Sequence, residues 1–186
     1  MNIGKHIYII FSILFFIVLS GCMKTYKLQN GITKVPAKSQ VYKNKAKFNM
    51  SLNALIDTNV VYEEFDLNYK LLRRLDNHPE NSYYGAYKFY PNGYFNYFII
   101  DRDASLNENS FNPQYAGYRG VYYLKNVDIG YDLFSTVNQS GWLGKLTGVF
   151  FFRGDTLLVH GYQTKDTSIY IKRKLPGQLM NFNVDW

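Results

Sequence analysis

The sequence contains few of the side chains on which most protein chemistry depends. It has one cysteine and three histidines among 186 residues. The cysteine, Cys22, has no second thiol with which to form an internal disulfide. Zinc sites need three or four clustered ligands, whereas His6, His78 and His160 lie far apart along the chain. We therefore expect no disulfide, no histidine-based metal site and no cofactor.

Catalytic motifs are missing as well. The sequence has no Gly-x-Ser-x-Gly element for a nucleophilic serine. Glu63 and Glu64 are neighbours in a predicted strand, so their carboxylates face opposite sides and are unsuited to act as a pair. The segment 101–112 begins like a calcium loop, but it lacks the glycine at its sixth position and has Asn112 in place of the final glutamate. These absences indicate a protein that is not an enzyme.

Acidic residues are absent from the first 56 positions, which explains the net charge of +7. Residues 49–186 contain 13 basic and 14 acidic side chains, so this part of the chain is close to neutral. We therefore expect no basic surface for nucleic acid. Residues 22–56 are rich in lysine and show little hydrophobic periodicity, which predicts a flexible tether. Its lysines either attract an anionic membrane surface or only keep the tether solvated.

A hydrophobic run without charge extends over residues 7–19. These 13 residues are fewer than the roughly 20 that a helix needs to cross a bilayer. A short apolar run after a basic start is typical of a secretory signal peptide. An uncleaved membrane helix is the alternative.

The residues Leu19-Ser20-Gly21-Cys22 resemble the lipobox of bacterial lipoproteins. The resemblance implies that residues 1–21 are a signal peptide, cleaved between Gly21 and Cys22, and that Cys22 carries diacylglycerol and an acyl chain such as palmitate. Two or more chains hold a protein stably on a membrane, whereas one chain binds only marginally. The expected location is the cell envelope, and the outer membrane if the host is Gram-negative.

From residue 57 onward, hydrophobic and aromatic residues alternate with polar ones, which is typical of β-strands. Strands are predicted at residues 60–65, 83–90, 94–101, 119–125, 127–137, 145–152, 155–162 and 168–174. Pro91-Asn92-Gly93 and Arg153-Gly154-Asp155 have the composition of tight turns, and we expect Gly93 to adopt a left-handed backbone conformation. A helix or a loop is predicted over residues 67–75. We expect a single domain over residues 57–186.

Eight short antiparallel strands predict an all-β, up-and-down barrel, because closure removes exposed sheet edges. A flattened β-sandwich is the alternative. The succession "YKFYPNGYF", "VDIGYDLF" and "GKLTGVFFFRGDTLLV" resembles the small lipocalin-like domains of bacterial lipoproteins. That resemblance also implies a small barrel.

Aromatic residues make up 18% of the chain and concentrate on the predicted hairpin 83–98. One face of this hairpin must pack the core, and the other either forms ring pairs in water or contacts a ligand, lipid or partner. The long segment 103–118 could cap the mouth of the barrel.

Two functions are open at this point. The protein either binds a small apolar or aromatic ligand inside the barrel, or it is a structural or interaction protein of the envelope, with a filled barrel that docks a protein partner. The interior distinguishes them. Inward glycines at positions 130, 148 and 161 would leave a cavity, whereas inward tyrosine and phenylalanine rings would fill it.

Overall fold

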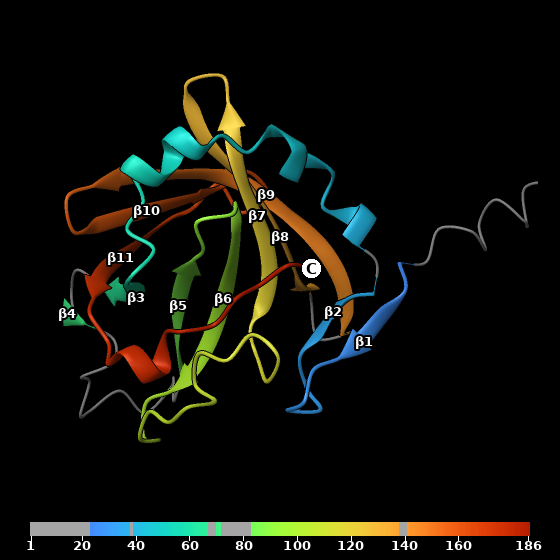
Figure 1. Cartoon of the computed structure of the whole chain (residues 1–186), viewed down its shortest axis with the longest axis vertical. Helices are drawn as coiled ribbons and strands as arrows, with labels where there is room; N and C mark the ends of the chain where they lie inside the picture. The colour runs from blue at the N-terminus through green and yellow to red at the C-terminus, as the bar shows by residue number, and fades with distance from the viewer. Residues whose placement is uncertain (1–22, 38, 67–69, 72–82, 138–140) are drawn as a thin grey trace, which may run out of the picture.

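The computed structural model describes residues 23–37, 39–66, 70–71, 83–137 and 141–186. Eight antiparallel strands form a closed barrel (Figure 1), in which the last strand pairs with the first. The strands are β3 (Val61–Asp66), β5 (Tyr83–Phe89), β6 (Tyr94–Asp101), β7 (Tyr118–Lys125), β8 (Asp128–Val137), β9 (Trp142–Arg153), β10 (Thr156–Gly161) and β11 (Thr167–Arg173). The predicted all-β barrel and its eight strands are confirmed.

The region around residues 67–75 was expected to form a helix or a loop. Lys70 and Leu71 instead form the short strand β4 (Lys70–Leu71), which pairs with the end of β3. The rest of this range lies outside the described residues. Among the described residues, no helix is long and apolar enough to cross a membrane.

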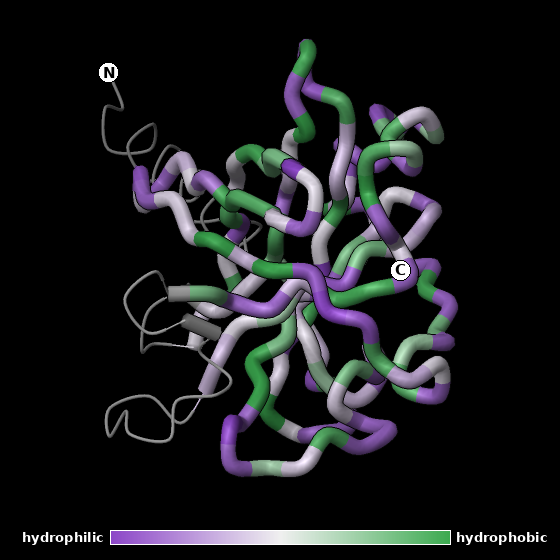
Figure 2. Tube along the Cα trace, turned by 90° about the vertical axis from the view of Figure 1, so that its left-hand side faces the viewer, coloured by the Kyte–Doolittle hydropathy of each residue, from purple (hydrophilic) through white to green (hydrophobic). Residues whose placement is uncertain are grey.

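Successive side chains of each strand point to opposite faces, inward and outward. Figure 2 shows how hydropathy varies along the chain. On β8, Ile129, Tyr131 and Leu133 belong to the barrel core, whereas Phe134 belongs to a separate cluster on the outer wall. Ile129, Tyr131 and Leu133 therefore share the inward face of β8.

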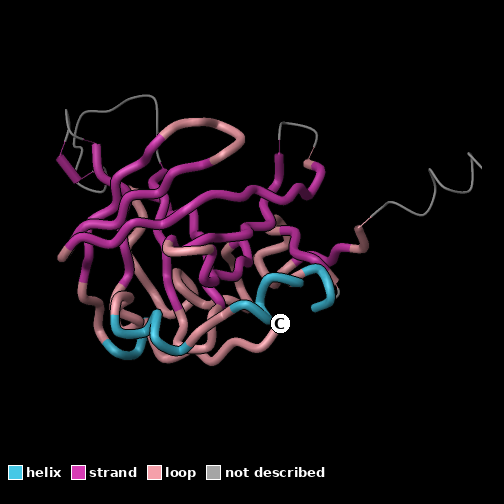
Figure 3. Tube along the Cα trace, turned by 90° about the horizontal axis from the view of Figure 1, so that it is seen from above, coloured by secondary structure: helices cyan, strands magenta, loops and turns pink. Residues whose placement is uncertain are grey.

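The segment before the barrel is folded, which differs from the predicted tether. It contains the hairpin β1 (Thr25–Lys27) and β2 (Lys34–Pro36), followed by the short helices η1 (Ser39–Val41), η2 (Lys43–Lys47) and η3 (Met50–Ala54). These helices gather on one side of the strands (Figure 3).

Widely spaced apolar residues hold this segment in place. Val35, Tyr42 and Leu52 are buried, and Leu52 packs on the core at one end of the barrel. The expectation of a flexible tether therefore does not hold for residues 23–37 and 39–56. The lysines between the anchoring side chains break the hydrophobic periodicity, so the sequence pattern did not reveal the packing.

Part of the segment between β6 and β7 packs on the outer wall of the barrel. Phe111 is buried against Phe98, with 5.4 Å between their ring centroids. Met180, in the C-terminal segment after the short helix η5 (Gly177–Leu179), joins the same cluster. The outer faces of β3, β5 and β6 are thus covered by two segments that are far apart in the sequence.

The turn between β5 and β6 brings the N-terminal segment close to the backbone. Gly93 has a φ of +85°, which confirms the left-handed conformation predicted for it. A Cβ at this position would lie 2.6 Å from Cγ of Phe48. The turn therefore requires glycine both for its backbone conformation and for the Phe48 ring packed against it.

We predict that Gly93→Ala lowers the free energy of unfolding by more than about 1 kcal/mol, because it adds a steric clash to the backbone strain. Gly154→Ala is the matched control, since Gly154 also has a positive φ, of +57°, but no atom lies within 4 Å of its Cβ position. Urea denaturation of both variants measures the difference. Equal losses in the two variants would show that the Phe48 ring does not restrict residue 93.

Candidate functional site

The interior of the barrel is occupied by aromatic rings. Phe150 lies at their centre, with its ring centroid 5.2 Å from that of Phe89, 5.3 Å from that of Phe95 and 4.5 Å from that of Tyr131. The buried aromatic members of this core are Tyr62, Tyr87, Phe89, Phe95, Tyr122, Tyr131, Phe150 and Tyr170. They come from seven of the eight barrel strands, so rings meet from almost every side.

Inward glycines do not leave a cavity, because rings from neighbouring strands lie over them. A Cβ at Gly148 would lie 2.7 Å from the ring of Tyr131, its cross-strand partner. Cβ atoms at Gly120 and Gly85 would likewise collide with the rings of Phe95 and Tyr97. The close approach of ring and backbone is what allows so many aromatic side chains to fit.

The remaining two glycines proposed to face inward differ from Gly148. Gly130 lies on the outer face, where a Cβ would contact the ring of Tyr123 at 3.0 Å. At Gly161, at the end of β10, a Cβ would lie 2.7 Å from Oγ1 of Thr164. Gly130 is therefore not part of the interior, and Gly161 lies against a turn residue.

The interior also contains polar groups. Glu64 points into the barrel, where its Oε2 accepts a hydrogen bond of 2.8 Å from the backbone N–H of Gly85. Burial raises the pKa of Tyr97 to about 12, and the negative charge of Glu64 adds to the rise. Burial also raises the pKa values of Tyr87 and Tyr170, whose ring centroids are 4.8 Å apart. These hydroxyls are therefore neutral in the physiological range and unsuited to act as bases.

Glu63, the neighbour of Glu64, lies on the outer wall, so the predicted opposition of the two carboxylates is confirmed. Its Oε1 is 2.6 Å from Nη1 of Arg173, and Tyr84 donates its hydroxyl to the same oxygen at 3.4 Å. The Glu63 side chain is fully buried. This ion pair connects β3 to β11 across the closure of the barrel.

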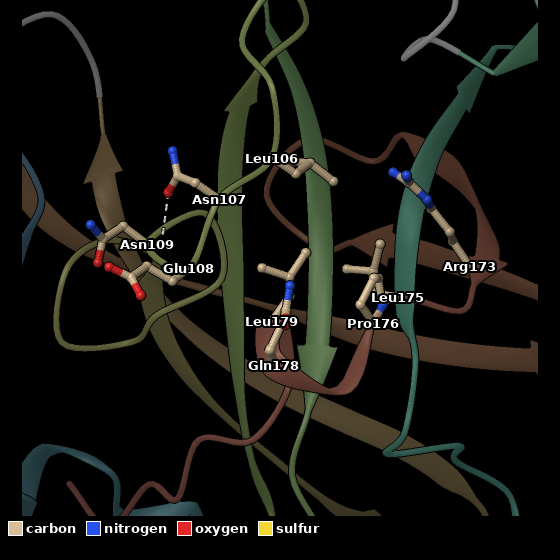
Figure 4. Close-up of a pocket in the computed structure, with 9 residues that line it drawn as sticks. All are labelled: Leu106, Asn107, Glu108, Asn109, Arg173, Leu175, Pro176, Gln178 and Leu179. Carbon is tan, nitrogen blue, oxygen red and sulfur yellow. Dashed lines mark hydrogen bonds between the residues drawn. The ribbon is translucent and has the colours of Figure 1, made fainter.

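A groove of about 690 Å³ lies beside this ion pair on the outer wall (Figure 4). The segment 106–109 forms one side and the segment 175–179 the other, with Arg173 at one end. Two polar side chains of the groove have partners within the protein. Asn107 accepts from the backbone N–H of Asn109, and Arg173 is paired with Glu63.

A second pocket has a volume of about 360 Å³. Five segments meet there: the β1–β2 hairpin, η1, the segment before β7, β7 itself and the C-terminal residues. Arg119 reaches it from the outer face of β7 and is only 3% exposed. The Cζ atom of Arg119 lies 4.5 Å from the ring centroid of Trp186 and 5.5 Å from that of Tyr26. Aromatic rings thus hold the guanidinium in place.

Tyr42 lies in the same pocket. Burial raises the pKa of its hydroxyl, and the positive charge of Arg119 opposes this rise. Tyr42 packs edge-on against Phe134, with 5.1 Å between the ring centroids. A neutral phenol and a charged guanidinium therefore share one small pocket. We consider this pocket the candidate binding site.

The residues singled out from the sequence have mixed outcomes. Cys22, Gly21, His6 and His78 lie outside the described residues. His160 lies on β10, where its Nδ1 is 3.1 Å from Oγ1 of Thr167. Among the described residues there is no group of three or more His, Cys, Asp or Glu side chains that could hold a metal ion.

The start of the calcium-like segment forms a local turn. Oδ1 of Asp101 accepts a hydrogen bond from the backbone N–H of Asp103. Arg153-Gly154-Asp155 is the turn between β9 and β10, as predicted. Neither segment contributes to the Arg119 pocket.

Sequence reasoning did not identify the Arg119 pocket. A single arginine on an alternating strand suggests a solvated outer face. The only hint was the position of Arg119 within the aromatic stretch "YRGVYY". Comparison with known proteins adds no assignment, since no protein-family model, no curated protein and no solved structure matches the chain.

The buried tyrosines predict a loss of stability at alkaline pH. Their folded-state pKa values are raised above the ordinary value of 10, for example to about 12 in Tyr62, Tyr97 and Tyr131. The unfolded chain therefore releases these protons first, and the free energy of unfolding should fall steeply as the pH rises above about 10. Urea denaturation across pH 7–12 measures this fall.

Lys88 should change the stability with pH in the direction opposite to that of the buried tyrosines. Burial lowers its pKa from 10.5 to about 8, so the folded state releases this proton first and stability should rise modestly between about pH 8 and 10.5. Lys88→Met should abolish the rise and keep the fall above pH 10. A wild-type stability that stays constant to pH 12 would contradict the packing of the tyrosines.

Proposed function

We propose that this protein is a non-catalytic lipoprotein of the bacterial cell envelope, held on a membrane by acyl chains on Cys22, and that it binds a protein partner on the outside of its barrel. The lipobox-like residues 19–22 support the anchor. The ring-filled interior is the observation that favours docking of a protein partner over binding of a ligand inside the barrel.

A ligand inside the barrel would have to replace ring contacts that hold the core together. Truncating a buried aromatic side chain typically costs about 3–5 kcal/mol, because the lost contacts are not recovered by relaxation. Phe150 alone packs against rings from three other strands, β5, β6 and β8. A rigid, filled barrel is better suited to present an outer surface than to admit a ligand.

Exposed apolar side chains near the end of β6 offer such a surface. Ile32, in the turn between β1 and β2, is 80% exposed, and Ile99 on β6 is 54% exposed. Both line a groove of about 490 Å³, together with the partly exposed ring of Tyr115. Apolar and aromatic side chains around a groove are typical of the centre of a protein–protein interface.

The anchor is tested with Cys22→Ala. This variant should lose incorporation of labelled palmitate, and it should leave the membrane fraction or accumulate as uncleaved precursor. Ser20→Ala is the matched control, since it keeps a small residue in the lipobox-like stretch and should be processed normally. Normal processing and membrane fractionation of Cys22→Ala would refute the lipoprotein assignment.

The docking surface is tested by placing a photocrosslinking amino acid at Ile99 in cells that express the full chain. We expect a discrete protein adduct from this position. Val127, which is 93% exposed in the β7–β8 turn, serves as the control position and should give none. Equal adducts from the two positions, or none from Ile99, would count against docking at this groove. Native mass spectrometry of the purified protein tests the alternative, because copurified lipid would support a ligand inside the barrel.

A further inference from the structure

The Arg119 pocket contains a buried positive charge without a counter-ion. Among the described residues, no carboxylate lies within 4.0 Å of the guanidinium, and the one side-chain hydrogen bond of Arg119 is a long one, 3.5 Å from Nη2 to Oε1 of Gln114. Burying a charge is costly unless a partner compensates it. The rings of Trp186 and Tyr26 cover the guanidinium but offer no acceptor in its plane.

Three polar atoms in this pocket are buried without a hydrogen-bond partner among the described residues. They are Nε of Arg119, the hydroxyl of Tyr42 and Nε1 of Trp186. All three residues line the same pocket, although they come from β7, from the residue between η1 and η2, and from the C-terminal segment. Buried polar groups are nearly always satisfied, so three unsatisfied atoms at one place indicate a missing partner.

The chemistry of these atoms defines what the partner must offer. Arginine and the indole N–H can only donate hydrogen bonds, and the neutral phenol of Tyr42 can donate one too. The complementary ligand is therefore an acceptor with a negative charge. A planar carboxylate fits because the guanidinium binds two oxygens in its own plane through parallel N–H groups, while its faces are stacked on rings.

The charge at the rim of the pocket favours a ligand with a single negative charge. The exposed residue Asp185 also lines it, and its carboxylate would repel a dianion such as phosphate more strongly than a monoanion. The volume of about 360 Å³ lies at the low end of the range of small-molecule sites. Pro36 and Ala37 add apolar wall. We propose that this pocket binds a small organic monocarboxylate, held by Arg119, Tyr42 and Trp186.

The experiment uses the ¹⁵N-labelled full chain in non-ionic detergent, with benzoate and acetate as probes. The readout is the NMR signal of the Trp186 indole N–H, which Trp142→Phe assigns because the chain has two tryptophans. We expect saturable shifts of this signal with the carboxylates. Benzamide, which has the shape of benzoate without its charge, should cause none at the same concentration, and phosphate should bind more weakly than benzoate.

Variants locate the binding. Tyr42→Phe keeps the ring and removes the hydroxyl, so it should weaken benzoate binding about tenfold at an unchanged melting temperature. Trp186→Phe should also weaken benzoate binding about tenfold, which calorimetry measures because this variant lacks the indole signal. Arg119→Gln should abolish binding if it folds. Val41→Ala is the control, since Val41 is the neighbour of Tyr42 but does not line the pocket.

Several outcomes would overturn the proposal. These are no shift of the Trp186 signal at saturating benzoate, equal binding of benzamide, tighter binding of phosphate, or an unchanged affinity in folded Tyr42→Phe. None of these outcomes bears on the anchor at Cys22 or on docking beside Ile99, because both are measured without a carboxylate probe.

Discussion

The need to fill a closed barrel of eight strands governs the structure. Such a barrel is just wide enough for side chains to fill its interior or for one small ligand to occupy it. Here the rings fill the central part, and they do so because glycines on neighbouring strands allow them to lie against the backbone. Tyr131 over Gly148 and Phe95 over Gly120 are the clearest cases. A larger residue at either glycine would expel a ring, so the core depends on pairs of large and small residues.

Because rings fill the central part of the barrel, the pockets described above lie outside it. The covering segments are the N-terminal segment, the C-terminal segment and the long connection between β6 and β7, and the unsatisfied polar atoms of the Arg119 pocket lie where these segments meet. Arg119 illustrates this, because β7 supplies the charge while the N-terminal segment and the C-terminal residues supply the walls. The barrel thus acts as a rigid frame, and the pockets of the outer wall form between the segments that wrap it.

Much of the fold follows from local patterns, and the rest depends on contacts between distant segments. Alternation and turn composition predicted all eight barrel strands and the left-handed Gly93, because both signals lie within a few residues. The packing of Val35, Tyr42 and Leu52 was missed, since single apolar residues among lysines have no period. Which glycines face inward could not be assigned from the sequence, because the face depends on strand register, such as the pairing of Gly130 with Tyr123 on β7. The candidate site was not predictable, since its residues come from five separate segments.

The folded N-terminal segment has a mechanical consequence for a protein mounted on a membrane. If Cys22 carries lipid as proposed, strand β1 begins only three positions later, at Thr25. Three residues span at most about 11 Å, so the lipid and the first strand would lie close together. The barrel would then be held close to the membrane with little freedom to move away from it or to rotate. It would present one flank to the headgroups and hold its grooves at a fixed height, so only partners that approach at that height would reach them.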